Sequence, residues 1–177
     1  MNISNIDLDK AKRWQADAKI KLDSNLSFEG FISSWITFNY FYSSFCTDND
    51  ITYQTWLKDN SRKNGDKSKL LFLVADNQFQ TIYLDFKNSH SYLFDTAIDL
   101  PIIDMENRKY VPNNRNGRFK FNDLTIQEAF SILYQIRNNL IHGSKDPEKN
   151  GRDFFLSHIA GNFLIPFLKI LIDKTSN

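Results

Sequence analysis

The sequence predicts a mainly α-helical protein with one small β-hairpin-like insertion around residues 101–121. Three observations lead to this fold class. Apolar side chains recur every three or four residues through several long segments, which is the spacing of amphipathic helices. One segment instead carries Pro101 and Pro112 and then an Asn- and Gly-rich stretch, which is typical of a turn. The 177 residues include 16 phenylalanines, which suffice for the core of a single domain spanning residues 1–177.

Two helices are expected in the first third of the chain. The first covers about residues 7–22, and the second is longer and covers about residues 27–46. Large aromatic side chains recur along the second helix and predict an aromatic spine in the core: Phe31, Trp35, Phe38, Tyr42 and Phe45. Asn39 lies at the edge of this spine and leaves two interpretations open. It is either a buried amide bonded to a neighbouring helix or an amide that orients the side chains of a site.

The middle third is harder to interpret. Short helices are expected over about residues 50–60 and 67–74, on either side of a polar turn. Residues 80–86 fit a strand or a helix fragment equally well. The basic side chains in and after the turn are interpreted as solvated surface: Arg62, Lys63, Lys67 and Lys69. The tip of the insertion is also basic and is expected to be exposed, with Arg115, Arg118 and Lys120.

The helix expected from residue 125 to residue 142 carries the most informative pattern. Thr125 and Glu128 form a capping box, which marks its first turn. Apolar side chains then define one broad stripe, and at about 100° per residue Arg137 falls inside it. A guanidinium is rarely buried without a partner, because its desolvation is costly. We therefore expect Arg137 to pair with a carboxylate, to line a subunit interface, or to face a polar cleft.

His142 is the last residue of this expected helix, directly before Gly143. The helix C-terminus favours the charged imidazolium, and a histidine that titrates near neutral pH suits proton transfer. The alternative is that His142 only caps the helix, with Gly143 in the left-handed conformation. Arg137 and His142 point about 140° apart around the helix axis, so a site that uses both requires local unwinding or a second copy of the chain.

A turn over residues 144–151 and a final helix over about residues 152–172 complete the expected fold, with a kink at Pro166.

The 22 basic and 21 acidic residues nearly cancel in charge, so any RNA-binding surface must be a local patch. Cys46 is the only cysteine, which excludes a disulfide framework and suits a reducing compartment; we interpret it as buried core. With no signal peptide and no apolar run long enough to span a bilayer, we expect a soluble cytoplasmic protein without a membrane association. We find no glycine-rich phosphate loop and no Cys/His spacing for a metal, so we expect neither cofactor nor metal.

The segment around Arg137 closely resembles the Arg-x4-His motif of the HEPN superfamily of all-helical domains. The resemblance rests on Arg137-Asn138-Asn139-Leu140-Ile141-His142, with Leu133-Tyr134 before it and Gly143-Ser144-Lys145 after it. It extends to Arg152-Asp153 at the start of the last helix and to the earlier helix around Trp35 and Asn39. These parts cover the second helix and the last third of the chain.

The resemblance implies a metal-independent endoribonuclease that acts as a homodimer on an RNA substrate. Two copies of the motif helix would form a composite cleft in which His142 acts as general base or acid and Arg137 binds the scissile phosphate. Cleavage would leave a 2′,3′-cyclic phosphate. Asn138 would hold the phosphate or the arginine, Asn39 would support the site, and Lys145 would be a further phosphate ligand. Members of this kind are commonly toxins or effectors of anti-phage and stress defence, restrained by an antitoxin or another regulatory partner protein.

Two other interpretations remain open. Some members of the superfamily have lost catalysis and serve as nucleotide- or protein-binding modules, which the near-zero net charge and the many aromatic residues also fit. Alternatively, the chain is a helical structural protein in which Arg137 forms a buried pair with a carboxylate such as Glu128 or Asp153. The environment of Arg137 distinguishes these interpretations.

Overall fold

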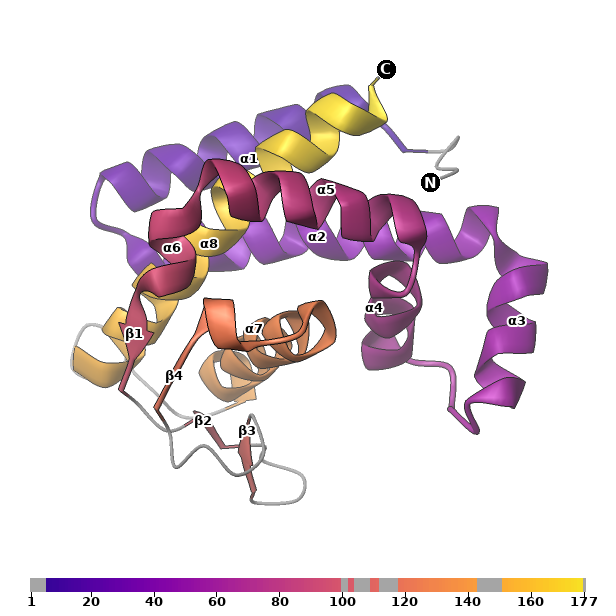
Figure 1. Ribbon diagram of the computed structural model, residues 1–177. Coiled ribbons are helices and arrows are strands. Elements are labelled where there is room, and N and C mark those ends of the chain that lie inside the picture. Colours follow the sequence, from indigo (N-terminus) through magenta and orange to yellow (C-terminus); the bar gives the residue numbers. More distant parts are fainter. Residues whose placement is uncertain (1–5, 100–101, 104–108, 112–117, 143–150, 177) are drawn as a thin grey trace.

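The described part of the chain is mainly helical and includes a few short strands, as predicted (Figure 1). The computed structural model describes residues 6–99, 102–103, 109–111, 118–142 and 151–176, with the side chains of Tyr110 and His142 left out. The helices in these ranges are α1 (Leu8–Asp23), α2 (Ser27–Asp48), α3 (Asp50–Asp59), α4 (Asp66–Val74), α5 (Asn77–Ser89), α6 (Ser91–Asp95), α7 (Ile126–His142) and α8 (Gly151–Thr175). A short 3-10 helix, η1 (Phe121–Asp123), precedes α7.

Helices α1, α2 and α8 pack against one another and form the framework of the fold. Two glycines permit this close packing. A Cβ atom at Gly30 of α2 would lie 3.0 Å from the backbone nitrogen of Leu22 in α1 and 3.1 Å from the carbonyl oxygen of Ala18. A Cβ atom at Gly161 of α8 would lie 3.3 Å from Cδ1 of Leu22. Both glycines therefore make room for the end of α1, which packs against α2 and α8.

The predicted aromatic spine is buried in the core. All five of its side chains are at most 4% exposed. Phe38 lies at the centre, where its ring centroid is 5.1 Å from that of Phe130 in α7 and 6.3 Å from that of Phe167 in α8. Phe79 of α5 joins the same cluster, 5.2 Å from Phe130. These ring contacts hold α7 against α2, and so fix the helix that carries Arg137.

The ambiguous segment 80–86 is part of a helix. Helix α5 begins after Asp76, whose side chain accepts a hydrogen bond from the backbone nitrogen of Phe79 at 2.9 Å. Four large side chains then lie buried at helical spacing: Phe79, Ile82, Tyr83 and Phe86. The sequence was ambiguous because residues 80–86 contain only part of this pattern, and its start at Phe79 lies outside them.

The insertion consists of two short antiparallel strand pairs. Strand β1 (Ala97–Ile98) pairs with β4 (Phe119–Lys120), and β2 (Ile102–Ile103) pairs with β3 (Tyr110–Val111). The paired region begins before residue 101, where the sequence placed its start. At its base, Arg118 forms an exposed ion pair with Asp99 at 3.1 Å. The predicted Asn- and Gly-rich tip with Arg115 lies outside the described residues.

Helix α8 is longer than predicted and continues through Pro166. It is the one helix among the described residues that is long and apolar enough to cross a membrane, with a mean hydropathy of 1.7 over its most apolar window. However, 61% of that window is buried inside the protein, as in the core helix of a globular domain.

Candidate functional site around Arg137

The predicted capping box sets the start of α7. The Thr125 backbone nitrogen donates to Oε2 of Glu128 at 2.8 Å, and the Glu128 backbone nitrogen donates to Oγ1 of Thr125 at 3.2 Å. The apolar stripe of α7 then faces the core, with Phe130 and Leu133 fully buried. This packing fixes the rotation of the helix, and so places Arg137 at the boundary between core and solvent.

Arg137 is half-buried and only partly satisfied by hydrogen bonds. Its Nη1 donates to Oδ1 of Asn138 at 2.8 Å. Its Nε is buried and has no hydrogen-bond partner among the described residues. The Asn138 contact engages one of the five N–H groups of a guanidinium, so the cation retains donors that can hold another group.

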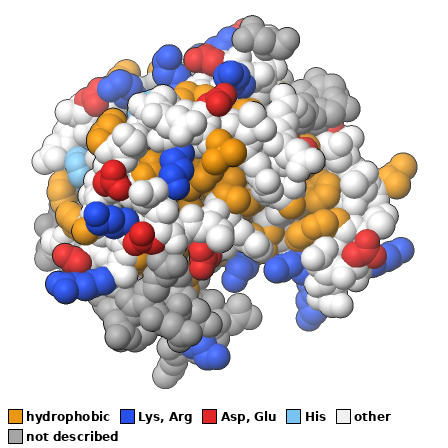
Figure 2. Space-filling model, viewed as in Figure 1, with side chains coloured by type: hydrophobic (Ala, Val, Ile, Leu, Met, Phe, Trp, Pro, Cys, Tyr) orange, Lys and Arg blue, Asp and Glu red, His pale blue; other side chains and the backbone are white. Residues whose placement is uncertain are grey.

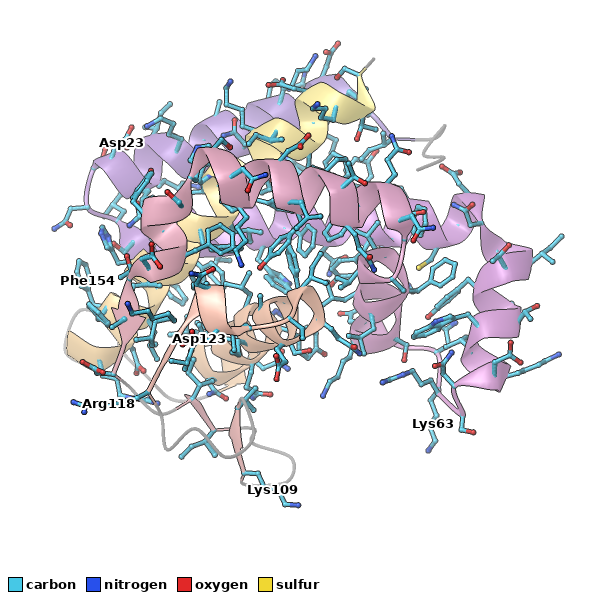
Figure 3. All side chains as sticks on the ribbon, viewed as in Figure 1. Asp23, Lys63, Lys109, Arg118, Asp123 and Phe154 are labelled. Atoms are coloured by element: carbon cyan, nitrogen blue, oxygen red, sulfur yellow. The ribbon has the colours of Figure 1, made fainter. Side chains whose placement is uncertain are left out.

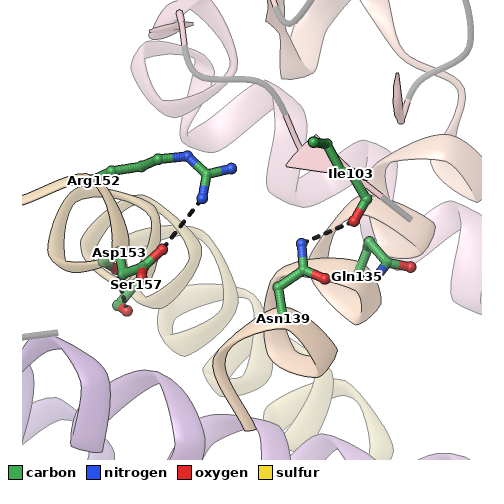
Figure 4. A network of polar contacts seen from close by, with 6 residues as sticks. All are labelled: Ile103, Gln135, Asn139, Arg152, Asp153 and Ser157. Carbon is green, nitrogen blue, oxygen red and sulfur yellow. Dashed lines mark hydrogen bonds and ion pairs between the residues drawn. The ribbon is translucent and has the colours of Figure 1, made fainter. Parts of the chain in front are cut away.

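Neither carboxylate suggested for a structural ion pair contacts Arg137. Glu128 is engaged by Thr125 at the helix start. Asp153 is 1% exposed and pairs with its neighbour Arg152, with Nη1 3.4 Å from Oδ1 (Figure 4). Within the described residues, Arg137 forms no ion pair with a carboxylate. The structural interpretation is therefore wrong in the two pairings that it named.

Two tyrosines lie near Arg137, one on its own helix and one on α2, and the sequence indicated only the first. Tyr134, one turn before Arg137, packs edge-on against Trp35 of α2 with ring centroids 6.0 Å apart. Tyr42 lies one ring further along α2, 6.5 Å from Trp35. Trp35 Nε1 and Tyr42 Oη are both buried, and the indole N–H interacts with the hydroxyl and lowers its pKa. Arg137 lies near enough for its charge to act on the same hydroxyl.

The electrostatics link Arg137 to Tyr42. Burial raises the pKa of the Tyr42 hydroxyl well above its ordinary value, the negative charge of Asp66 raises it further, and the positive charge of Arg137 opposes both. Tyr42 therefore remains neutral beside the cation and can act as a hydrogen-bond donor. The sequence indicated only that Tyr42 belongs to the aromatic spine of α2. Helical spacing could not show which face of α7 packs against that spine.

The other predicted site residues are not brought together with Arg137 by any described contact. Asn39 is half-buried, and its Oδ1 accepts a hydrogen bond from Ser43 of its own helix at 3.1 Å. It therefore makes no described bond to a neighbouring helix or to Arg137. His142 ends α7, but its side chain lies outside the described residues, as does Lys145.

The two adjacent asparagines of the motif, Asn138 and Asn139, form different contacts. Asn138 is half-buried and holds Arg137, whereas Asn139 is 7% exposed and faces the insertion. Asn139 Oδ1 accepts a hydrogen bond from Nε2 of Gln135 at 2.9 Å, and its Nδ2 donates to the carbonyl oxygen of Ile103 at 3.0 Å (Figure 4). Asn139 thus ties strand β2 to the motif helix, a structural function that the motif alone did not reveal.

Arg137 is a half-buried cation that pairs with no carboxylate among the described residues, so it is available for an anionic ligand. Within the described ranges, no three His, Cys, Asp or Glu side chains lie close enough to hold a metal ion. Comparisons with protein-family models, curated proteins and solved structures returned no match.

Proposed function

We propose that the protein is a metal-independent endoribonuclease of HEPN type, in which Arg137 and His142 act in a composite homodimer cleft. The observation that carries the proposal is the state of Arg137. It is half-buried in a stripe where an apolar side chain would pack better, yet it pairs with no carboxylate in the described structure. A cation kept in such a place without an anionic partner is suited to an anionic ligand, and a phosphate fits its planar array of donors.

In this proposal each motif residue has one task. Arg137 binds the scissile phosphate and stabilises the charge that grows on its oxygens in the transition state. Asn138 holds the guanidinium in place through the 2.8 Å hydrogen bond. His142 takes the proton from the ribose 2′-hydroxyl or gives one to the leaving 5′-oxygen, and the product end is a 2′,3′-cyclic phosphate. Lys145 adds positive charge to the same phosphate path, and Asn39 supports the site from α2.

The activity would require restraint in a cell. We propose that the protein is a toxin or a defence effector held inactive by an antitoxin or another regulatory partner protein. Such a partner would have to cover the Arg137 cleft or keep two copies of α7 apart.

RNA cleavage in EDTA tests the proposal directly. The wild-type protein should cut a mixture of single-stranded and structured RNAs, and Arg137→Ala and His142→Ala should not. Arg13→Ala is a matched control, because Arg13 is an exposed arginine on α1, and it should cut like the wild type. Circular dichroism must first show that each variant is folded. Cleavage that persists in both motif variants would refute the proposal, and RNA that is bound but uncut would favour a binding module.

Mixing the two inactive variants tests the composite cleft. If one site takes Arg137 from one protomer and His142 from the other, a mixed dimer contains one intact site. Random exchange then restores about a quarter of the wild-type activity, because half of the dimers are mixed and each has one working site of two. If both residues of a site come from the same chain, mixing restores nothing.

A further inference from the structure

A surface pocket lies at the opposite end of α7 from His142. It is a pocket of about 330 Å³ formed where α3, the end of α4 and the beginning of α5 meet the first turn of α7. Its lining includes Trp56 and Asn60 from the α3 side, Gln80 from α5, and Thr125 and Gln127 from the start of α7. This volume lies at the lower end of the range of small-molecule sites and suits a group the size of a nucleobase.

The amide side chains of the pocket have hydrogen-bonding capacity to spare. Asn60 uses its Nδ2 to donate to the carbonyl oxygen of Trp56 at 2.9 Å, and Gln80 uses its Nε2 to donate to that of Val74 at 3.2 Å. Their side-chain oxygens form no hydrogen bond within the described structure. Gln127 is exposed, and neither the oxygen nor the nitrogen of its amide forms a hydrogen bond with another described residue. Amides that offer both acceptors and donors complement the edges of nucleobases.

Trp56, which lines the pocket, has the cation of Arg62 over its ring. Trp56 is half-buried, and its inner side packs against Phe72 with ring centroids 5.6 Å apart. The guanidinium of Arg62 lies over the Trp56 ring, 5.7 Å from its centroid. Bases of single-stranded RNA stack on aromatic rings and on arginine planes, and the arginine also attracts the phosphate backbone. Figure 2 shows this face, with Lys and Arg atoms beside apolar atoms where α3 and α4 lie in Figure 1.

The accessible face of α7 connects this pocket with Arg137. At 100° per residue, Gln127, Tyr134 and Asn138 point within about 40° of one another. Gln127 is exposed, and Tyr134 and Asn138 are half-buried, whereas the apolar stripe on the other side is buried. Asn138 holds Arg137. The path from Gln127 to Asn138 is about 16 Å along the helix axis, a length that a few nucleotides of a single strand can span.

We propose that this pocket binds one base of a single-stranded RNA whose scissile phosphate lies at Arg137. The inference rests on the proposed ribonuclease function and deepens it by naming a substrate class and a recognition subsite. The guanidinium of Arg62, which lies over the Trp56 ring, stacks on the base, and the amides of Asn60, Gln80 and Gln127 contact its edge. Lys63 lies in the loop between α3 and α4, at the lower edge of the molecule in Figure 3, and would attract the phosphate backbone there.

The test measures binding separately from cleavage. A short 2′-O-methyl RNA of mixed sequence lacks the 2′-hydroxyl that the reaction requires, so the full-length wild-type protein can bind it without cutting it. Fluorescence anisotropy should show that Gln127→Ala and Trp56→Leu each raise Kd about tenfold, which is typical for the loss of one stacked or hydrogen-bonded base. Gln78→Ala, an exposed glutamine of α5 that does not line the pocket, should leave Kd unchanged.

A second measurement locates the base. In the ¹⁵N-labelled protein, millimolar AMP, CMP, GMP or UMP should shift the side-chain amide signals of Asn60, Gln80 and Gln127, but not that of Gln78. Equal Kd values for Gln127→Ala and Gln78→Ala, together with unshifted pocket amides, would overturn the inference even if the protein cleaves RNA. Shifted amides and weakened binding in a protein that cuts no RNA would support the pocket and refute the proposed function. Because Trp56 packs on Phe72, Trp56→Leu could fail to fold, and Gln127→Ala, which removes no described hydrogen bond, then decides the question alone.

Discussion

Replacing Arg137 with leucine should abolish RNA cleavage without weakening the fold. The buried Nε of Arg137 has no hydrogen-bond partner among the described residues, and an unsatisfied buried donor costs about 1–3 kcal/mol. The substitution also removes the bond to Asn138, a partly buried contact worth about 1 kcal/mol. The variant avoids the cost of the unsatisfied donor and loses the hydrogen bond to Asn138. Its free energy of unfolding should therefore equal that of the wild type or exceed it by up to roughly 2 kcal/mol. For a domain of this size, each kcal/mol raises Tm by about 2–4 °C.

Urea unfolding followed by circular dichroism measures this effect, with RNA cleavage in EDTA measured on the same samples. Leu133→Ala is the matched control, because Leu133 lies on the same stripe of α7 and is fully buried. That variant should lose about 2–5 kcal/mol, which shows that the assay detects damage to this helix. If Arg137→Leu loses more than about 1 kcal/mol, the arginine stabilises the fold, and the argument that it is kept for a ligand fails.

Three further predictions concern the supports of α7 and the core. Asn139→Ala should lower the free energy of unfolding by about 1–3 kcal/mol, because it leaves the buried amide of Gln135 without its hydrogen-bond acceptor and removes the bond to Ile103. Urea unfolding measures the loss, and a protease should cut the insertion sooner in the variant. Glu128→Ala should cost about 1 kcal/mol through loss of the capping box, and a stability equal to that of the wild type would show that the cap is dispensable. Burial raises the pKa of Cys46 to about 12, so the native thiol should not react with DTNB at pH 8. Because the unfolded thiol loses its proton from about pH 8.5, this burial should lower stability progressively between that pH and 12; urea titrations at pH 7.5 and 10 should show a weaker pH dependence in Cys46→Ala.

The sequence predicted those parts of the fold that depend on local patterns. The capping box of Thr125 and Glu128 located the start of α7, and the spacing of the aromatic spine identified α2 as a core helix. The alternation around residues 80–86 was too short to distinguish a strand from a helix. It became clear only with Asp76 as the N-cap and Phe79 as the first buried residue of α5.

The surroundings of Arg137 could be predicted only in part. Helical periodicity placed the guanidinium inside an apolar stripe, whereas in the structure Arg137 is half-buried and Ile141 beside it is exposed, so the arginine lies at the edge of that stripe. Periodicity places Tyr134 one turn from Arg137, but it could not indicate that Tyr42 would lie near the guanidinium, because that depends on how α2 and α7 pack across the core. Nor could it separate the functions of Asn138 and Asn139, since adjacent amides have the same chemistry and differ only in the direction that each faces.

The hydrogen bond from Asn139 to Ile103 has a thermodynamic consequence for the site. Asn139 lies in the last turns of α7, directly after the residue that holds Arg137, so strand β2 and the guanidinium share one support. Linkage between two sites is reciprocal: if a molecule that grips the insertion changes the affinity of Arg137 for an anion, the anion changes the affinity for that molecule by the same factor. A partner that binds the insertion could therefore tune the site without touching it, and the Asn139 bond is the element whose loss would uncouple the two.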